Sequence, residues 1–160
     1  MLSVQIVCVG KLKEAYWRDA CAEYAKRMAP FCRFRITEVD EARVPEGASP
    51  AQIDDALRQE GARLRSHTPP GSWVAAMCIE ATPQPSEALA AKLASLTVRG
   101  VSSVAFWIGG SWGLAPELKR ACDCRISMSP MTFPHQLARV MLCEQLYRAC
   151  QINAGGKYHK

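Results

Sequence analysis

Apolar runs with strand character alternate with segments of helical periodicity along the whole chain, and this alternation constrains the fold most. The strand-like runs are 2–9 (LSVQIVCV), 73–80 (WVAAMCIE) and 101–108 (VSSVAFWI). The segments with helical spacing of apolar residues are 12–28, 50–66, 85–100 and 135–153. Strands that alternate with helices predict an α/β fold: a mainly parallel sheet with helices on both faces.

Shorter signals refine this prediction. Residues 31–39 alternate aromatic, Arg and β-branched positions, which predicts a half-exposed strand. Ser49-Pro50-x-Gln52 supplies an N-cap, a proline in the first turn and a capping-box partner for the helix that follows. A short helix at 115–122 and a brief strand at 125–129 are also expected. The 160 residues contain no repeat or linker, so we expect a single domain, 1–160.

In folds of this class, ligands collect at the carboxyl ends of the strands. Three such ends stand out, at residues 77–81, 108–113 and 127–133. The second contains GGSWG, whose glycines match neither a dinucleotide-binding fingerprint nor a phosphate-binding P-loop. By itself this loop fits a tight strand-to-helix turn as well as a close approach of a ligand to the backbone.

The distribution of charge and the pattern of cysteines limit the kinds of partner and metal site that we expect. The formal net charge of +5 belongs to residues 119–160, which suits a phosphate-rich partner or a solvated basic end. The eight cysteines contain no C-x-x-C pair and fall in apolar runs, which predicts buried free thiols and no metal. The first residues are typical of a strand rather than a signal peptide, and no apolar run is bilayer-length. We therefore expect a soluble, cytoplasmic protein that does not enter a membrane.

Five separated stretches resemble one known family. VGKLKEAYW, EYAKRMAPF, FWIGGSWGL, MTFPHQLARVMLCEQLYRA and the terminal KYHK are similar to the ribosomal RNA large-subunit methyltransferase H family, the smallest branch of the SPOUT methyltransferases. The resemblance runs essentially from end to end. It implies a SPOUT-type fold with a C-terminal trefoil knot, a homodimer, and S-adenosylmethionine as cofactor.

The resemblance also implies a reaction, methylation of N3 of a pseudouridine in 23S rRNA of the assembled 70S ribosome. Two alternatives stay open. One is a non-catalytic ribosome- or RNA-associated binding protein with the same fold. The other is a SPOUT tRNA methyltransferase, against which the short chain without an appended RNA-binding domain argues.

The family's cofactor-binding positions carry over by resemblance. They are Met77, Gly109, Met128, Ser129, Pro130, Met131, Thr132 and Phe133. Met77 replaces the usual leucine, and Pro130 stands where relatives often have Lys or Ala, which removes one backbone N–H. The segment after the strand-like run 73–80, which forms the rim of the expected site, usually reads EIxG in relatives. It reads IEAT here and lacks the glycine.

Catalytic candidates gather near the C-terminus. Displacement at a sulfonium methyl by a base nitrogen needs placement and a path for one proton, and no metal. The resemblance favours Arg148, Tyr158 and His159, with the tail shaping the acceptor pocket and Arg148 holding a phosphate.

The roles of three further residues in this region have two interpretations each. His135 is a possible base, or a capping or structural residue. Glu144 is a possible base, or the partner of Arg148 four residues on. Arg139 is a possible phosphate ligand, or part of a salt bridge between subunits.

Overall fold

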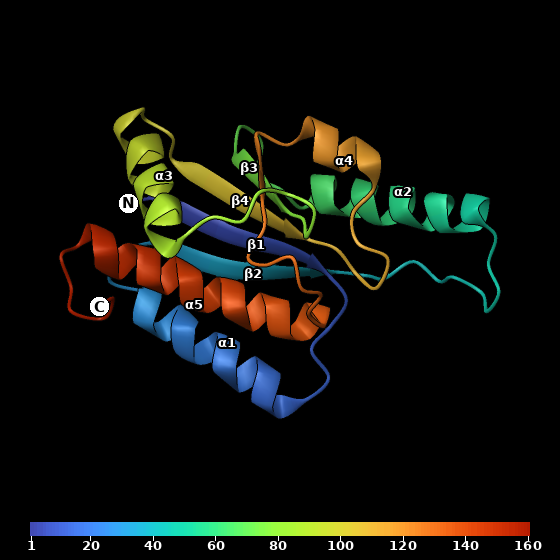
Figure 1. Ribbon diagram of the computed structural model, residues 1–160, viewed down its shortest axis with the longest axis horizontal. Coiled ribbons are helices and arrows are strands. Elements are labelled where there is room, and N and C mark those ends of the chain that lie inside the picture. The colour runs from blue at the N-terminus through green and yellow to red at the C-terminus, as the bar shows by residue number, and fades with distance from the viewer.

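The computed structural model describes residues 1–160 and contains one five-stranded sheet with helices on both faces (Figure 1). The strands are β1 (Ser3–Val9), β2 (Arg33–Val39), β3 (Trp73–Met77), β4 (Ser103–Ile108) and β5 (Cys124–Ile126). The helices are α1 (Ala15–Met28), α2 (Pro50–Ser66), α3 (Ser86–Val98), α4 (Pro116–Ala121) and α5 (His135–Asn153). All neighbouring strands are parallel, in the order β2-β1-β4-β3-β5, which confirms the predicted fold class.

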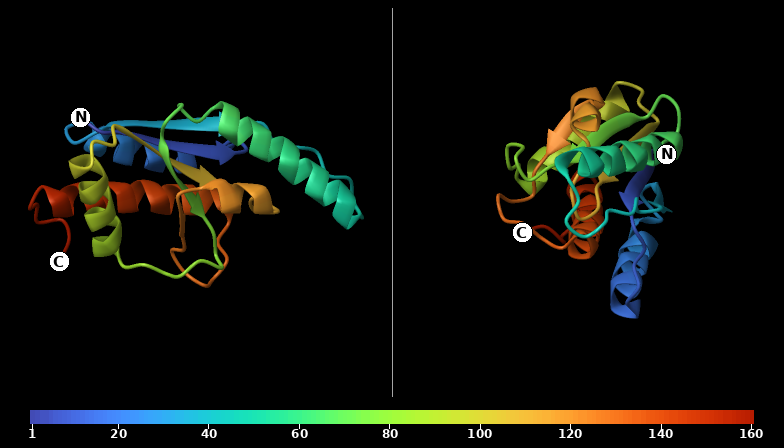
Figure 2. Two further views of the ribbon diagram at one scale, coloured as in Figure 1. Left: turned by 90° about the horizontal axis from the view of Figure 1, so that it is seen from above. Right: turned by 90° about the vertical axis from the view of Figure 1, so that its right-hand side faces the viewer.

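Two apolar layers cover the sheet, one on each face. Along β4, Phe106 belongs to the layer under α1, α3 and α5, whereas the next residue, Trp107, belongs to the layer under α2 and α4. Figure 2 shows these two groups of helices on opposite sides of the strands. Because both faces of β1 and β4 are buried, these strands are nearly continuous apolar runs.

The half-exposed strand predicted at 31–39 is observed as β2, an edge strand. Arg33 and Arg35 are exposed, whereas Phe34 and Ile36 are partly buried against the layer under α1, α3 and α5. The other edge is β5, which has only three residues. The central positions of β1 and β4 thus bring the carboxyl ends of the long strands to the middle of the molecule.

Two predicted boundaries illustrate local hydrogen bonding. The capping box is confirmed, since the Ser49 hydroxyl accepts from the Gln52 N–H at 3.3 Å and the Gln52 side chain accepts from the Ser49 N–H at 2.8 Å. The first helix begins at Ala15 rather than at residue 12. The Arg18 guanidinium binds the carbonyl oxygens of Leu12 and Lys13 at 2.9 and 2.6 Å, which holds those residues in a loop.

The cysteines are free, as expected, and five of them are buried. The buried ones are Cys8, Cys21, Cys32, Cys78 and Cys143. No three His, Cys, Asp or Glu side chains are grouped so that they could hold a metal ion. No helix is both long and apolar enough to cross a bilayer.

Candidate functional site

The three predicted strand ends meet around one cavity of about 140 Å³, which we call the strand-end cavity. Six of the eight predicted cofactor positions line it: Met77, Gly109, Met128, Ser129, Met131 and Phe133. Pro130 and Thr132 belong to the same loop but are exposed and do not line the cavity. Residues that are 50 positions apart in sequence therefore share one site because parallel strands end at the same edge.

The glycine loop closes on itself at the cavity wall. A Cβ atom on Gly109 would lie 2.2 Å from the carbonyl oxygen of Gly113, so no larger residue fits there. The Gly113 N–H donates to the Gly110 carbonyl at 3.0 Å, and Gly113 has a positive φ of 79°. A Cβ on Gly113 would meet nothing within 4 Å, so this side of the main chain is open to a ligand.

Ser127 connects the two other loops that line the cavity, the loop after β3 and the loop after β5. The buried Ser127 hydroxyl lies 3.0 Å from the carbonyl oxygens of Ile79 and of Ser129. The rim formed by residues 78–84 has no positive φ, since only glycines adopt one in this chain. Thr82, which stands in place of the family's rim glycine, therefore does not need the positive φ that favours glycine.

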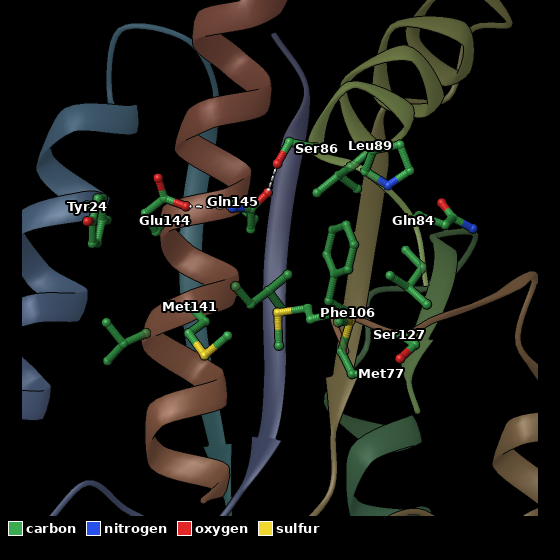
Figure 3. A pocket seen from close by; sticks show the side chains of 15 residues that line it. Tyr24, Met77, Gln84, Ser86, Leu89, Phe106, Ser127, Met141, Glu144 and Gln145 are labelled. Carbon is green, nitrogen blue, oxygen red and sulfur yellow. Dashed lines mark hydrogen bonds between the residues drawn. The ribbon is translucent and has the colours of Figure 1, made fainter. Parts of the chain in front are cut away.

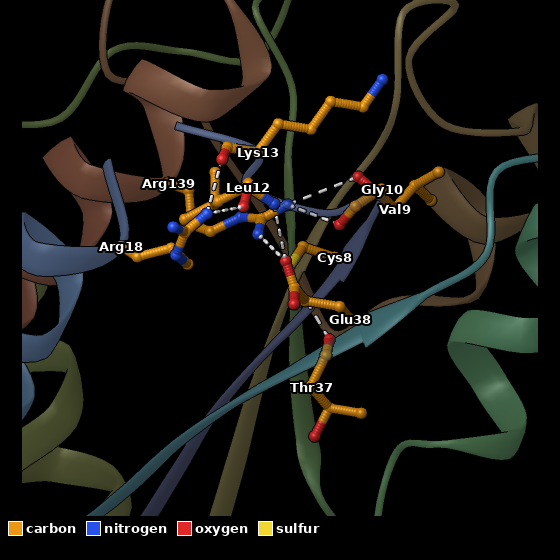
Figure 4. A network of polar contacts seen from close by, with 9 residues as sticks. All are labelled: Cys8, Val9, Gly10, Leu12, Lys13, Arg18, Thr37, Glu38 and Arg139. Carbon is orange, nitrogen blue, oxygen red and sulfur yellow. Dashed lines mark hydrogen bonds and ion pairs between the residues drawn. The ribbon is translucent and has the colours of Figure 1, made fainter. Parts of the chain in front are cut away.

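A buried arginine fixes the first turns of α5 beneath the cavity (Figure 4). Arg139 is 1% exposed and pairs with Glu38 at 2.6 Å. Its guanidinium also donates to the Gly10 carbonyl oxygen at 3.0 Å. Both predictions for Arg139 are wrong, because a fully buried guanidinium bound within the chain reaches neither an RNA phosphate nor another subunit.

His135 lines the strand-end cavity at the start of α5. Burial, and then the nearby Arg139 cation, lowers the pKa of His135 below its usual value, so the imidazole is neutral at pH 7. No side chain caps the amino end of α5, so a capping role for His135 is wrong. A neutral ring at the cavity wall remains able to accept a proton.

A second, larger cavity of about 470 Å³ lies between α3 and α5, and we call it the interhelical cavity (Figure 3). It shares Met77, Ile126 and Met128 with the strand-end cavity, so the two are adjacent. Figure 3 shows its polar edge, where the Ser86 hydroxyl donates to Gln145 at 2.6 Å. Gln145 in turn donates to Glu144 at 2.8 Å. The cavity thus combines an apolar floor with amide, hydroxyl and carboxylate groups.

The three predicted catalytic residues converge on Glu144. Arg148 donates to the Glu144 carboxylate at 2.9 and 2.5 Å, which confirms the predicted pair within α5. The Tyr158 hydroxyl donates to the same oxygen at 3.1 Å, and Nδ1 of His159 lies 3.3 Å from Arg148. None of the three lines either cavity, but Glu144 lines the interhelical one. Arg148 and Tyr158 therefore contact a residue of the cavity wall without lining the cavity themselves.

Burial, followed by the hydrogen bond to Glu144, raises the pKa of Tyr158 to about 12. Its ring packs against Tyr147, with centroids 4.8 Å apart, and under the Arg148 guanidinium at 4.7 Å. Tyr158 is consequently a protonated phenol at pH 7, suited to donate a hydrogen bond rather than to accept a proton.

Glycines make the return of the tail possible. Gly155 has a positive φ of 70°, and the Gly156 N–H donates to the Gln151 carbonyl at 2.8 Å. A Cβ on Gly156 would lie 1.9 Å from the Gln151 side chain. The last residues thus fold back along α5 toward α3 (Figure 2).

Comparisons with known proteins show the family of this chain. A family model described as "Predicted SPOUT methyltransferase" matches residues 2–159. The ribosomal RNA large subunit methyltransferase H of Lactiplantibacillus plantarum is 43% identical over 159 residues, covering 99% of this chain and 100% of the relative. The protein of that name from Bifidobacterium animalis subsp. lactis is 46% identical over the same shares. The chain belongs to the ribosomal RNA large subunit methyltransferase H family of SPOUT methyltransferases.

Solved structures show the same SPOUT fold at low identity. A probable methylase family protein from Haemophilus influenzae Rd KW20 aligns with a TM-score of 0.54 at 14% identity, covering 100% of this chain and 72% of the other. A tRNA (m1G37) methyltransferase from Aquifex aeolicus aligns with a TM-score of 0.51 at 11% identity, covering 91% and 69%. These two likenesses concern the arrangement of strands and helices alone.

Two polar residues of this SPOUT protein escaped the sequence analysis. Glu87 lies in the first turn of α3, and its carboxylate is 2.9 Å from Nε2 of His159. Gln145 links α5 to Ser86 and lines the interhelical cavity. No local signal marks either residue, because Gln145 contacts a helix 59 positions away and Glu87 contacts the tail 72 positions away.

Proposed function

We propose that this chain transfers the methyl group of S-adenosylmethionine to N3 of a pseudouridine in 23S rRNA of the assembled 70S ribosome. The observation that carries the proposal is the convergence of Met77, Gly109 and the 128–133 loop on one cavity. The full-length similarity to enzymes that bear a ribosomal RNA methyltransferase name supports the class of substrate.

The residues of the strand-end cavity fit the adenine ring of the cofactor, and because the cavity measures only about 140 Å³, the rest of the molecule would extend past Met77 and Met128 toward the interhelical cavity. Met77, Met128 and Phe133 offer apolar and sulfur-containing surfaces that suit a purine ring. The open side of Gly113, where a Cβ would meet nothing, leaves the main chain free to approach the ligand. The remaining predicted contacts, through residues 128–133, would come from a loop in which Met131 N–H is already bound by the Ser129 hydroxyl at 3.0 Å.

The interhelical cavity is the best place for the acceptor base. Its volume lies in the range of about 300–1,000 Å³ that is typical of small-molecule sites. It adjoins the strand-end cavity through Met77 and Met128, so a base in it would lie next to the methyl donor. Gln145 and Ser86 present the donors and acceptors that the edge of a uracil-type ring requires.

The cofactor and the protein would each supply a part of the reaction. When bound, S-adenosylmethionine supplies an electrophilic methyl group and its own leaving group. The protein orients the base and receives the N3 proton. Tyr158 donates a hydrogen bond, Arg148 provides a cation for a phosphate or a developing negative charge, and His135 and His159 are the candidate proton acceptors. In the arrangement described, Glu144 holds Arg148 and Tyr158 and is itself saturated with donors.

We further propose that the protein acts as a homodimer. On α5, Leu137 is only half-buried within one chain and lines neither cavity, so apolar surface is left for a partner. The net charge of +5 is small for a protein that binds RNA alone. A paired subunit and the shape of the ribosome would supply the rest of the recognition surface. Because the proposed substrate is the ribosome, we propose that the protein acts in the cytoplasm.

The trefoil knot is part of the same proposal. It is supported by a parallel bridge between Pro83 and Ser127, in which the Gln84 N–H donates to the Ser127 carbonyl oxygen at 3.4 Å. This bridge places the chain after β5 beside the loop after β3. Knots are otherwise nearly absent from proteins.

The proposed function is tested with ribosomes from a strain that lacks the corresponding gene. Purified protein and methyl-labelled cofactor are incubated with intact 70S ribosomes, with separated subunits, or with naked 23S rRNA. We expect label at N3 of one pseudouridine, and only with assembled ribosomes. Label in tRNA would favour the tRNA enzyme, and label in no RNA would overturn the proposal.

A further inference from the structure

The C-terminal tail contacts its own helix and also α3. Glu144, Tyr147 and Arg148 of α5 contact Tyr158. Glu87 of α3 makes a contact from outside α5, and its carboxylate faces Nε2 of His159 at 2.9 Å. Glu87 follows Ser86, which binds Gln145 across the interhelical cavity. α3 is therefore linked to α5 through Ser86 and to the tail through Glu87.

The partners of His159 determine its tautomer. A guanidinium can only donate hydrogen bonds, so Nδ1 of His159 must present its lone pair to Arg148, 3.3 Å away. The proton then lies on Nε2, where it is donated to Glu87. A hydrogen bond from its own backbone, and then the His159 contact, lowers the pKa of Glu87, so this carboxylate is ionised at pH 7.

This arrangement resembles the orientation of a base by a carboxylate on its far side. While Arg148 binds Nδ1, His159 has no free lone pair. A substrate phosphate that draws Arg148 away would free Nδ1, with Glu87 still fixing the ring from the other nitrogen. The N3–H bond of the base would then break as the Nδ1–H bond forms, and the nitrogen electron pair would bond to the methyl group as the methyl carbon–sulfur bond of the donor breaks, its electrons remaining on sulfur. Glu87 would stabilise the resulting imidazolium without accepting the proton.

We propose that Glu87 is a positioning residue that holds His159 as its Nε2–H tautomer and ties the tail to α3. The proposal rests on the proposed function for the catalytic consequence, but the tautomer and the tie are properties of the free protein. Because the Glu87 side chain is 61% exposed, its contribution is modest, and we expect a change in rate of roughly three- to tenfold.

The test combines ¹⁵N NMR of the histidine rings with kinetics. The chain has three histidines, so each ring is assigned by substitution of the other two. In the unmodified protein we expect His159 to show a protonated Nε2 and an unprotonated Nδ1. In Glu87→Ala the two tautomers should mix, and kcat should fall roughly three- to tenfold while KM for the methyl donor changes less than about twofold.

Two further variants sharpen the result. Glu87→Gln keeps an oxygen that accepts from Nε2–H, so it should retain the tautomer and recover most of the rate. Glu117→Ala is the matched control, because Glu117 is also an exposed glutamate in the first turn of a helix but contacts only Arg58, at 4.0 Å. It should leave both the His159 signals and the rate unchanged.

Unchanged His159 signals in Glu87→Ala would overturn the proposal, and so would mixed tautomers with an unchanged kcat. Absence of methyl transfer by the unmodified protein would instead count against the proposed function. The NMR measurement on the free protein would still decide whether Glu87 sets the tautomer of His159, so the two failures are distinguishable.

Discussion

The strand-end cavity and the C-terminal tail are built from different kinds of interaction. The cavity is shaped by main chain and apolar side chains, with Gly109 packed against the Gly113 carbonyl and Ser127 binding two loops. The tail is held by charged and aromatic side chains around Glu144. The first region depends on steric fit and changes abruptly when an atom is added. The second depends on charge and responds gradually to pH and salt.

The largest effect is expected from Gly109→Val. Even a Cβ would lie 2.2 Å from the Gly113 carbonyl oxygen, so the loop must open and the cavity must lose its wall. We expect a loss of about 1–3 kcal/mol in the free energy of unfolding and no measurable cofactor binding by calorimetry. The sequence alone predicts only that Gly109 allows a ligand to approach the backbone; the structure adds that the loop itself requires glycine.

Gly113→Ala is the matched control for that variant. Its Cβ has open space, and only the positive φ of 79° opposes it. We expect about 1 kcal/mol of destabilisation and weakened but measurable binding. Equal binding by Gly109→Val and the unmodified protein would contradict the steric account of this region.

The next largest effect separates the two regions. Removal of residues 157–160 takes away Tyr158 and His159 but leaves every residue of the strand-end cavity in place. We expect methyl transfer to ribosomes to fall by at least about a hundredfold, as for loss of placement and proton transfer together. Cofactor affinity should stay within about twofold. Normal turnover by the shortened chain would refute a catalytic role for the tail.

A smaller effect is expected from Glu144→Gln, which removes the charge at the centre of the tail. The pKa of Tyr158, raised to about 12 by burial and then by Glu144, should fall toward its ordinary value near 10. Ultraviolet titration of tyrosine ionisation measures this change, with Tyr158→Phe identifying the signal. An identical Tyr158 titration in Glu144→Gln and in the unmodified protein would contradict the statement that Glu144 raises the pKa of Tyr158.

The same pKa predicts how the tail responds to alkali. Because the folded-state value is raised above the unfolded one, the stabilisation from Tyr158 is complete below pH 10 and is lost as the pH rises through about 12. Cofactor binding in the strand-end cavity should not follow this titration, since no tyrosine lines it.

The smallest effect is expected from Pro130→Ala. Pro130 is exposed and does not line the cavity, so a change in unfolding free energy within about 0.5 kcal/mol is expected. The variant restores one N–H to the loop. A gain in cofactor affinity of more than about fivefold, measured by calorimetry, would show that this N–H is used as a ligand contact.

The parts that sequence predicts best are those with a local physical cause. The strand-like runs and the capping box at Ser49 depend on neighbours in the chain, and both were confirmed. The meeting of residues 77, 109 and 128–133 followed from the rule that parallel strands end at one edge. The family resemblance, which rests on five separated motifs, supplied the identities of the cofactor positions.

The parts that sequence misses depend on contacts between distant elements. Arg139 carries a charge typical of a surface residue, yet it is buried because Glu38 and the Gly10 carbonyl satisfy it. Glu87 is an ordinary helix-start carboxylate until the tail folds back onto it. In both cases the deciding partner lies more than 70 positions away, where no local pattern reaches.

The central claim is that the strand-end cavity holds the methyl donor. The most direct measurement is a crystal structure of the protein grown with S-adenosylhomocysteine, the demethylated cofactor. We predict that its density will lie between Met77, Gly109 and the 128–133 loop, with Gly113 main chain in contact. Density located elsewhere, or side chains closing the cavity while the ligand is bound at another surface, would contradict the account.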